Sequence, residues 1–238
     1  MNSQSFLHLV FLRVPCVLRG ERFSVDNATN PEQIKWIKAA VFAACLVPLA
    51  RLAWLGFHSR LGANPIEYIT HSTGWWTLTF LLITLSVTPL RRLLNLPWLL
   101  RLRRMFGLFA FFYVSLHFIT YIWLDQFFDW NEIVKDVAKR PFITIGFSAF
   151  VLLIPLAATS TNAMVKRLGA RRWQLLHRLV YAIAALGVLH FWWLVKKDIT
   201  EPFIFASLLA LLLIIRLLYL LKQQRSASPP SAARSQVA

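Results

Sequence analysis

Charge is scarce in this 238-residue chain: 15% of the residues are charged, and Asp and Glu number 10 against 26 Lys and Arg. Four stretches carry no charged residue at all, and each is close to the ~17–25 residues of a membrane-spanning helix. They are residues 74–90, 105–124, 141–165 and 179–195. Such runs exclude an ordinary soluble domain and indicate a polytopic membrane protein.

Cysteine is almost missing as well. Cys16 and Cys45 fall on or near the side predicted to be cytoplasmic, where disulfides are not expected, and no metal-binding motif uses them. The chain also lacks a glycine-rich dinucleotide-binding turn after a strand, so it is not expected to perform hydride chemistry alone.

Hydrophobic residues make up 58% of the chain, and the mean hydropathy is +0.57. Two further apolar stretches contain Arg51 and Arg216, each near enough to an end for the guanidinium to reach the headgroups. We therefore predict an all-α polytopic membrane helix bundle with six transmembrane helices. The predicted spans are about 36–57, 72–90, 105–124, 141–160, 174–195 and 202–221.

The predicted membrane domain covers residues 35–222. It lies between an N-terminal cytoplasmic extension, 1–34, and a disordered cytoplasmic tail rich in Ser, Ala and Pro, 223–238. Basic residues collect between spans two and three and between spans four and five, so the positive-inside bias places these loops and both termini in the cytoplasm. The outer loops 125–139 and 196–201 are then the predicted docking surfaces for a partner.

The formal net charge of +16 follows the sides of the membrane, and no recognised nucleic-acid-binding fold accompanies it. Nucleic acid is therefore not expected as a partner. Arginines near the inner surface could contact anionic membrane lipid or heme propionates, although the positive-inside bias alone accounts for them.

Histidines inside the apolar segments carry the functional prediction, because an imidazole in hydrocarbon is unfavourable without a partner. His117 lies eight residues before Asp125 and His190 six residues before Lys196. At ~1.5 Å of rise per residue, they lie roughly 12 and 9 Å from the outer edge. Two histidines at one depth on separate helices predict the axial ligands of a low-spin heme b whose iron serves electron transfer.

His177 lies thirteen residues before His190, which is roughly 20 Å of rise and about 140° of rotation on an ideal helix. It cannot share the outer porphyrin, and facing the same core would need a bend, for which Gly187 is the candidate. His177 therefore either ligates a second, inner heme or lies at headgroup level. His71, at the outer start of span two, is an alternative ligand, a propionate partner or a water-exposed residue.

Packed or hydrogen-bonded histidines are the alternative, and they would suit a heme-free structural or transport protein. Transport would be favoured by Arg or Asp at the membrane midplane, and none occurs in the central parts of spans two to five. A third reading is a free-standing transmembrane heme reductase that acts on metal ions or another outer acceptor.

Short motifs through nearly the whole membrane domain carry a more specific resemblance. They are Leu61-Gly-Ala-Asn-Pro-Ile-Glu67, His71-Ser-Thr-Gly74, Thr88-Pro-Leu-Arg91, Arg103-Arg-Met-Phe-Gly-Leu108, Leu116-His117 with Tyr121, Lys139-Arg-Pro141, Thr159-Ser160, and Trp173-Gln-Leu-Leu-His-Arg-Leu-Val-Tyr181 followed by His190. On these segments the chain resembles the MsrQ (YedZ) family, which is related to ferric reductase-like membrane domains. The departures are the long N-terminal extension and Arg51.

The resemblance implies an electron-transfer subunit of the bacterial inner membrane that contains one or two b hemes. His117 and His190 match family heme-ligand positions, and His177 matches the family's other intramembrane histidine. Quinol or a cytosolic flavin reductase would be the donor, with FMN as a further cofactor whose site these residues do not place. The acceptor would be a periplasmic molybdopterin subunit, MsrP, which repairs oxidised methionine in envelope proteins.

Overall fold

The computed structural model describes residues 30–195 and 198–227. It is helical, with no strand within those ranges. Predictions for the N-terminal extension up to residue 29, for Cys16, for Lys196 and for the tail beyond residue 227 lie outside the described residues. Cys45 is a free thiol, buried in the first described helix.

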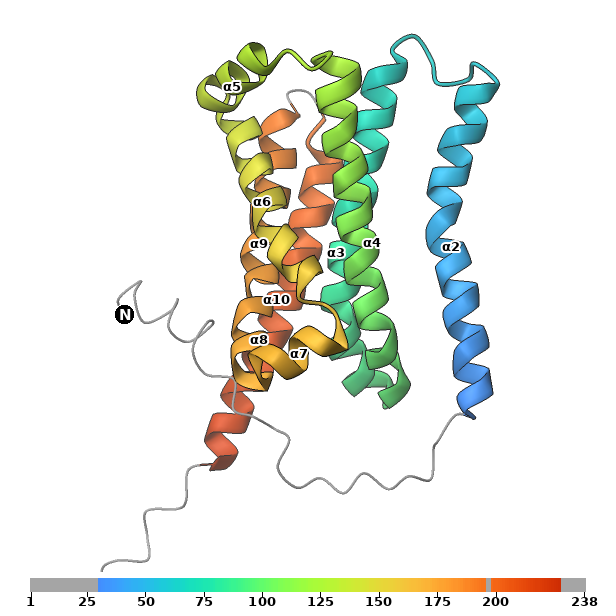
Figure 1. Cartoon of the computed structure of the whole chain (residues 1–238). Helices are drawn as coiled ribbons and strands as arrows, with labels where there is room; N and C mark the ends of the chain where they lie inside the picture. The colour runs from blue at the N-terminus through green and yellow to red at the C-terminus, as the bar shows by residue number, and fades with distance from the viewer. Residues whose placement is uncertain (1–29, 196–197, 228–238) are drawn as a thin grey trace, which may run out of the picture.

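Six helices are long and apolar enough to cross a membrane, which confirms the predicted number of spans. They are α2 (Pro31–Phe57), α3 (Pro65–Leu94), α4 (Leu100–Ile119), α6 (Pro141–Ala158), α9 (Leu179–Leu194, preceded by α8, Ala170–His177) and α10 (Thr200–Ala227). A single 3-10 turn, η2 (Pro97–Leu99), leads into α4, and a π-helical turn, η3 (Thr120–Asp125), extends it. The first residue of α2 and the last residue of α10 lie at the same end of the bundle (Figure 1), as expected for a chain that crosses a membrane six times.

Capping residues decide where the helices begin, and they differ from the predicted span limits. The Asn30 side chain accepts a hydrogen bond from the Glu32 backbone N–H, and Pro31 fills the first helical position, so α2 starts before residue 36. Asn64 and Pro65 start α3 in the same way, ahead of residue 72. At the other end of the chain, α10 continues to Ala227, past the predicted start of the tail at residue 223.

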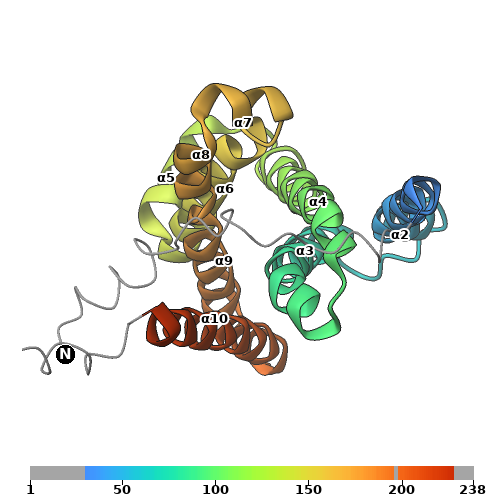
Figure 2. The same cartoon turned by 90° about the horizontal axis from the view of Figure 1, so that it is seen from below.

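Two antiparallel helix pairs form the centre of the bundle. α3 packs along α4, and α6 packs along α9, while α10 lies against both α3 and α9. Figure 2 shows α2 outside the α3–α4 pair. The buried core combines side chains from both pairs, including Phe80, Phe109, Leu153 and Ile183. Many apolar side chains on the outer faces stay exposed, as expected for helices that face lipid.

Short helices that the sequence analysis did not predict cover the ends of the bundle. α5 (Trp130–Lys139) lies across one end, and α7 (Asn162–Leu168) and α8 lie at the other (Figure 1). Asp129 starts α5 by accepting hydrogen bonds from the backbone N–H groups of Asn131 and Glu132. α5 was not predicted because its apolar residues alternate with polar ones and form no long apolar run.

No bend occurs at Gly187, the candidate position if His177 and His190 were to face one core. α9 passes through Gly187 without a break, and the helix is interrupted instead at Arg178, between α8 and α9. A Cβ atom at Gly187 would lie 2.8 Å from Leu78 Cδ2, so this glycine allows α3 to approach α9 closely. The absent side chain serves packing between helices and not bending of one helix.

Tyr113 attaches α2 to the rest of the bundle. Pro48 interrupts the α2 hydrogen-bond ladder because it has no N–H. The Tyr113 hydroxyl donates to the Cys45 carbonyl at 2.9 Å and accepts from the Leu49 N–H at 3.2 Å. Its ring is 1% exposed and stacks on Phe80 with centroids 5.3 Å apart. One phenol therefore satisfies backbone groups on both sides of the proline.

Replacing Tyr113 with Phe should loosen α2, because both hydrogen bonds are lost and water cannot replace them inside a bilayer. We expect the free energy of unfolding to fall by about 1–2 kcal/mol, measured by titration from mild detergent into sodium dodecyl sulfate. Tyr68→Phe is the control, because the Tyr68 hydroxyl has no hydrogen bond among the described residues. Equal stability of the two variants would contradict the role given to Tyr113.

Candidate functional site

Two histidines from different helix pairs meet inside the bundle. His117 comes from α4 and His190 from α9, and both are partly buried. Their ring centroids are 6.2 Å apart, and the ring planes lie 81° from each other. The structure thus brings together the two histidines that the sequence placed at one depth.

Each ring is fixed by a backbone carbonyl of the neighbouring helix. His117 Nδ1 lies 2.9 Å from the Thr70 carbonyl oxygen, and His190 Nδ1 lies 2.7 Å from the Phe142 carbonyl oxygen. A carbonyl only accepts hydrogen bonds, so Nδ1 must carry the proton in both rings. In the neutral imidazole, Nε2 then keeps its lone pair and is the metal-binding atom.

A glycine four residues after each carbonyl lies against the same ring. A Cβ built on Gly74 would be 3.1 Å from His117 Cε1, and one built on Gly146 would be 2.7 Å from His190 Nδ1. Positions four apart share one face of a helix. α3 and α6 therefore use the same construction: a carbonyl orients the histidine, and a glycine on the next turn leaves room for its ring.

The donor set fits a heme iron held between two imidazoles. A metal-bound imidazole nitrogen lies about 2 Å from the metal, so imidazoles on opposite faces of one ion have ring centres about 6 Å apart. The observed separation of 6.2 Å agrees with this spacing. The carbonyl contacts are the outer-shell partners that ligating histidines usually have. His117 and His190 would be the residues that hold the iron.

Aromatic side chains join α4 to α6 beside this pair. Phe118 of α4 packs on Phe147 and Phe150 of α6, with ring centroids 5.7 and 4.6 Å apart. Phe142, whose carbonyl oxygen accepts from His190, also places its own ring 6.4 Å from that imidazole. The surroundings of the pair are therefore rich in aromatic rings.

His177 is placed elsewhere, at the end of α8. Its Nε2 lies 3.1 Å from the Thr159 hydroxyl, and its ring stacks on Trp173 with centroids 4.0 Å apart. Trp173 Nε1 donates to the Thr159 carbonyl at 2.9 Å, so these three residues form one cluster between α6 and α8. His177 does not join the His117–His190 pair.

His71 lies near that pair without joining it. Its Nε2 is 3.8 Å from a Glu201 carboxylate oxygen, and its side chain is 48% exposed. Its ring meets Phe191 edge-on at 5.6 Å. Of the three roles predicted for His71, this exposed position near the start of α3 suits a polar, water-accessible residue that pairs with an acid.

Sequence reasoning missed Thr70, Phe142, Gly74 and Gly146. A glycine within an apolar helix is unfavourable by ~1 kcal/mol relative to alanine, so Gly74 and Gly146 already signalled a special packing requirement. The carbonyl contacts have no sequence signal, because every residue has a carbonyl. Only the packing of α3 on α4, and of α6 on α9, selects Thr70 and Phe142.

Comparisons with known proteins concern the membrane domain as a whole. A family model described as "Ferric reductase like transmembrane component" matches residues 73–188, a range that includes His117 and His177 and stops just before His190.

Curated relatives cover more of the chain, and their names are "Protein-methionine-sulfoxide reductase heme-binding subunit MsrQ". The relative from Herminiimonas arsenicoxydans is 62% identical over 192 residues, which is 80% of this chain and 88% of that protein. The relative from Ralstonia nicotianae is 53% identical, over 83% of this chain and 92% of that protein. The relative from Rhodospirillum rubrum is 54% identical, over 82% of this chain and 93% of that protein.

Proposed function

Because the chain belongs to the MsrQ family, a family of heme-binding subunits of protein-methionine-sulfoxide reductase, we propose that it holds heme b in the membrane and transfers electrons across it. The observation that carries the proposal is the His117–His190 pair, with both Nδ1 atoms bonded to carbonyls. When bound, the heme supplies a one-electron carrier. His117 and His190 would hold its iron, and two histidine ligands would favour electron transfer over binding of a small ligand.

The protein residues contribute orientation and exclusion of water. The Thr70 and Phe142 carbonyls hold each Nδ1 proton, so neither imidazole can turn its Nε2 away without losing a hydrogen bond in an apolar environment. Gly74 lets α3 lie close to the His117 ring, and Gly146 lets α6 lie close to the His190 ring. A rigid site of this kind reorganises little when its charge changes.

The proposed path runs from quinol or a cytosolic flavin reductase, with FMN as a further cofactor, to a periplasmic molybdopterin subunit, MsrP. Reduction of methionine sulfoxide there consumes two electrons and two protons and releases water. The high identity to subunits named for this reductase supports the path. The outer loop with α5 and the start of α10, residues 198–201, are the surfaces proposed for docking, because both lie at the end nearer the His117–His190 pair.

Visible spectroscopy of the purified protein tests the heme proposal first. Oxidised and dithionite-reduced samples should show a low-spin b-type spectrum, with heme quantified per chain. Mixing the reduced protein with MsrP and methionine sulfoxide should then reoxidise it faster than buffer does. Reoxidation by ferric citrate but not by MsrP would favour a free-standing metal reductase, and absence of heme in well-folded protein would overturn the proposal.

His177 is proposed as a residue of the inner side, either a ligand of a second heme or a headgroup-level residue. Substituting His177 with Ala should leave the His117–His190 signal intact, because the two sites share no contact. It should lower either the heme content per chain or the rate of reduction from the inner side. If the heme content and the rate of reduction both equal those of the wild type, the role of His177 is limited to its contacts with Thr159 and Trp173.

A further inference from the structure

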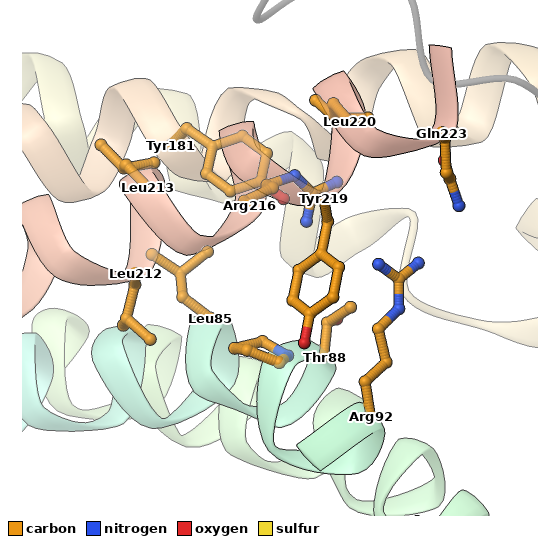
Figure 3. Close-up of a pocket in the computed structure, with 11 residues that line it drawn as sticks. Leu85, Thr88, Arg92, Tyr181, Leu212, Leu213, Arg216, Tyr219, Leu220 and Gln223 are labelled. Atoms are coloured by element: carbon orange, nitrogen blue, oxygen red, sulfur yellow. The ribbon is translucent and has the colours of Figure 1, made fainter. Parts of the chain in front are cut away.

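A pocket at the basic end of the bundle has no role in the proposed electron path. It lies between α3, α9 and α10, and leucines form much of its wall. Figure 3 shows Arg92 coming from α3 and Arg216 from α10 toward the space beside Tyr219. Thr88, Tyr181 and Gln223 complete its polar lining.

Arg216 is unusual because it is the one charged residue of α10 between Glu201 and Lys222. Arg216 lies six positions before Lys222, so it is roughly 9 Å inside the end of the span that Lys222 marks. None of the ion pairs in the described part of the chain includes Arg216 or Arg92. Arg103 of α4 is close enough to Arg216 to add to the positive potential.

Two tyrosines position these guanidinium groups. Arg92 lies over the Tyr219 ring at 4.9 Å, and Arg216 lies over the Tyr181 ring at 4.6 Å. A cation–π contact fixes the plane of a guanidinium but leaves its N–H donors available. Arg216 is half-buried and Arg92 is exposed, and two converging positive charges favour an anion between them. Guanidinium groups bind phosphate especially well.

The surroundings favour a ligand with an apolar tail. Leu85, Leu212, Leu213 and Leu220 line the pocket together with the arginines. The adjacent face of α10 carries exposed apolar side chains, with Leu211, Ile214 and Leu218 each more than half exposed. In a bilayer that face of α10 meets lipid.

We propose that this pocket binds an anionic phospholipid, with its phosphate held by Arg92 and Arg216 and its acyl chains along the α10 leucines. Basic pockets between membrane helices are known to recognise anionic headgroups. The positive-inside bias predicts basic residues at this end but does not predict that two of them converge on one apolar pocket. The pocket shares no lining residue with the His117–His190 pair or with His177.

Lipid titration followed by native mass spectrometry tests the proposal on the full chain in detergent. Phosphatidylglycerol should bind more tightly than phosphatidylcholine with matched acyl chains. The double variant Arg92→Gln, Arg216→Gln should bind phosphatidylglycerol about tenfold more weakly. Arg101→Gln is the control, because Arg101 is an exposed arginine at the same end that does not line the pocket. Arg216→Lys, which keeps the charge, should weaken binding less than Arg216→Gln.

Three outcomes would overturn the proposal, provided that an unchanged heme spectrum shows the variants are folded. The first is equal affinity for the two lipids. The second is equal loss in the pocket variant and in Arg101→Gln. The third is competition by dissolved FMN or inorganic phosphate without any preference for phosphatidylglycerol, which would identify a soluble phosphate as the occupant.

Discussion

Replacing His117 or His190 with alanine should each remove the low-spin heme spectrum, with heme per chain from that site falling close to zero. The reason is that His117 and His190, whose rings are 6.2 Å apart, would together hold the iron. With one imidazole removed, the other would have to hold the heme alone. Pyridine hemochrome quantification and the reduced-minus-oxidised spectrum measure the result.

His58→Ala is a matched control for this pair. His58 Nδ1 also lies near a backbone carbonyl, that of Trp54 at 2.8 Å, but the residue is exposed and stands apart from the paired rings. His71→Ala tests the alternative ligand, and both variants should retain the spectrum. Full heme retention in His117→Ala and His190→Ala would refute the assigned pair, and loss in His71→Ala would transfer one ligand position to His71.

Gly146→Ala should reduce heme affinity by about 10–100-fold, the usual effect of disturbing a ligand's supporting contacts. The new Cβ would lie 2.7 Å from His190 Nδ1 and 2.9 Å from Cε1, which is closer than such atoms can approach. Either the imidazole turns away from the Phe142 carbonyl or α6 and α9 separate. Both movements displace Nε2, so the spectrum should shift toward high spin while the protein remains helical.

The glycines of this bundle provide a graded control series. A Cβ at Gly74 would lie 3.1 Å from His117 Cε1, so Gly74→Ala should have a smaller effect than Gly146→Ala. At Gly107 the nearest atom is Thr84 Cγ2 at 3.8 Å, an ordinary contact, and Gly107→Ala should keep full heme. Equal heme affinity in all three variants would show that the rings do not need the space these glycines leave.

Family membership and the transmembrane class could be predicted from the sequence with little ambiguity. The motifs around His71, His117 and His177 are contiguous in the sequence, so they can be recognised without knowledge of the fold. The FMN site, the donor and the number of hemes have no such motif. They remain proposals, because they depend on surfaces built from several helices.

The sequence by itself determined the six spans and the common depth of His117 and His190. Both follow from local physics: hydrocarbon excludes charge along a continuous segment, and rise per residue converts position into depth. Caps at Asn30 and Asn64 were also readable, although apolar runs alone misplaced those helix starts.

Only the tertiary structure decided which way each histidine faces and what holds it there. Rotation about a helix axis is set by packing against neighbours far away in the sequence, so Thr70 became the partner of His117 and Phe142 that of His190. The same packing leaves α9 continuous at Gly187, with the interruption at Arg178, and the missing side chain of Gly187 makes room for Leu78. The same packing brings Arg92 of α3 and Arg216 of α10 to one pocket. Contacts between helices depend on how the side chains of both helices fit together, which neither helix determines alone.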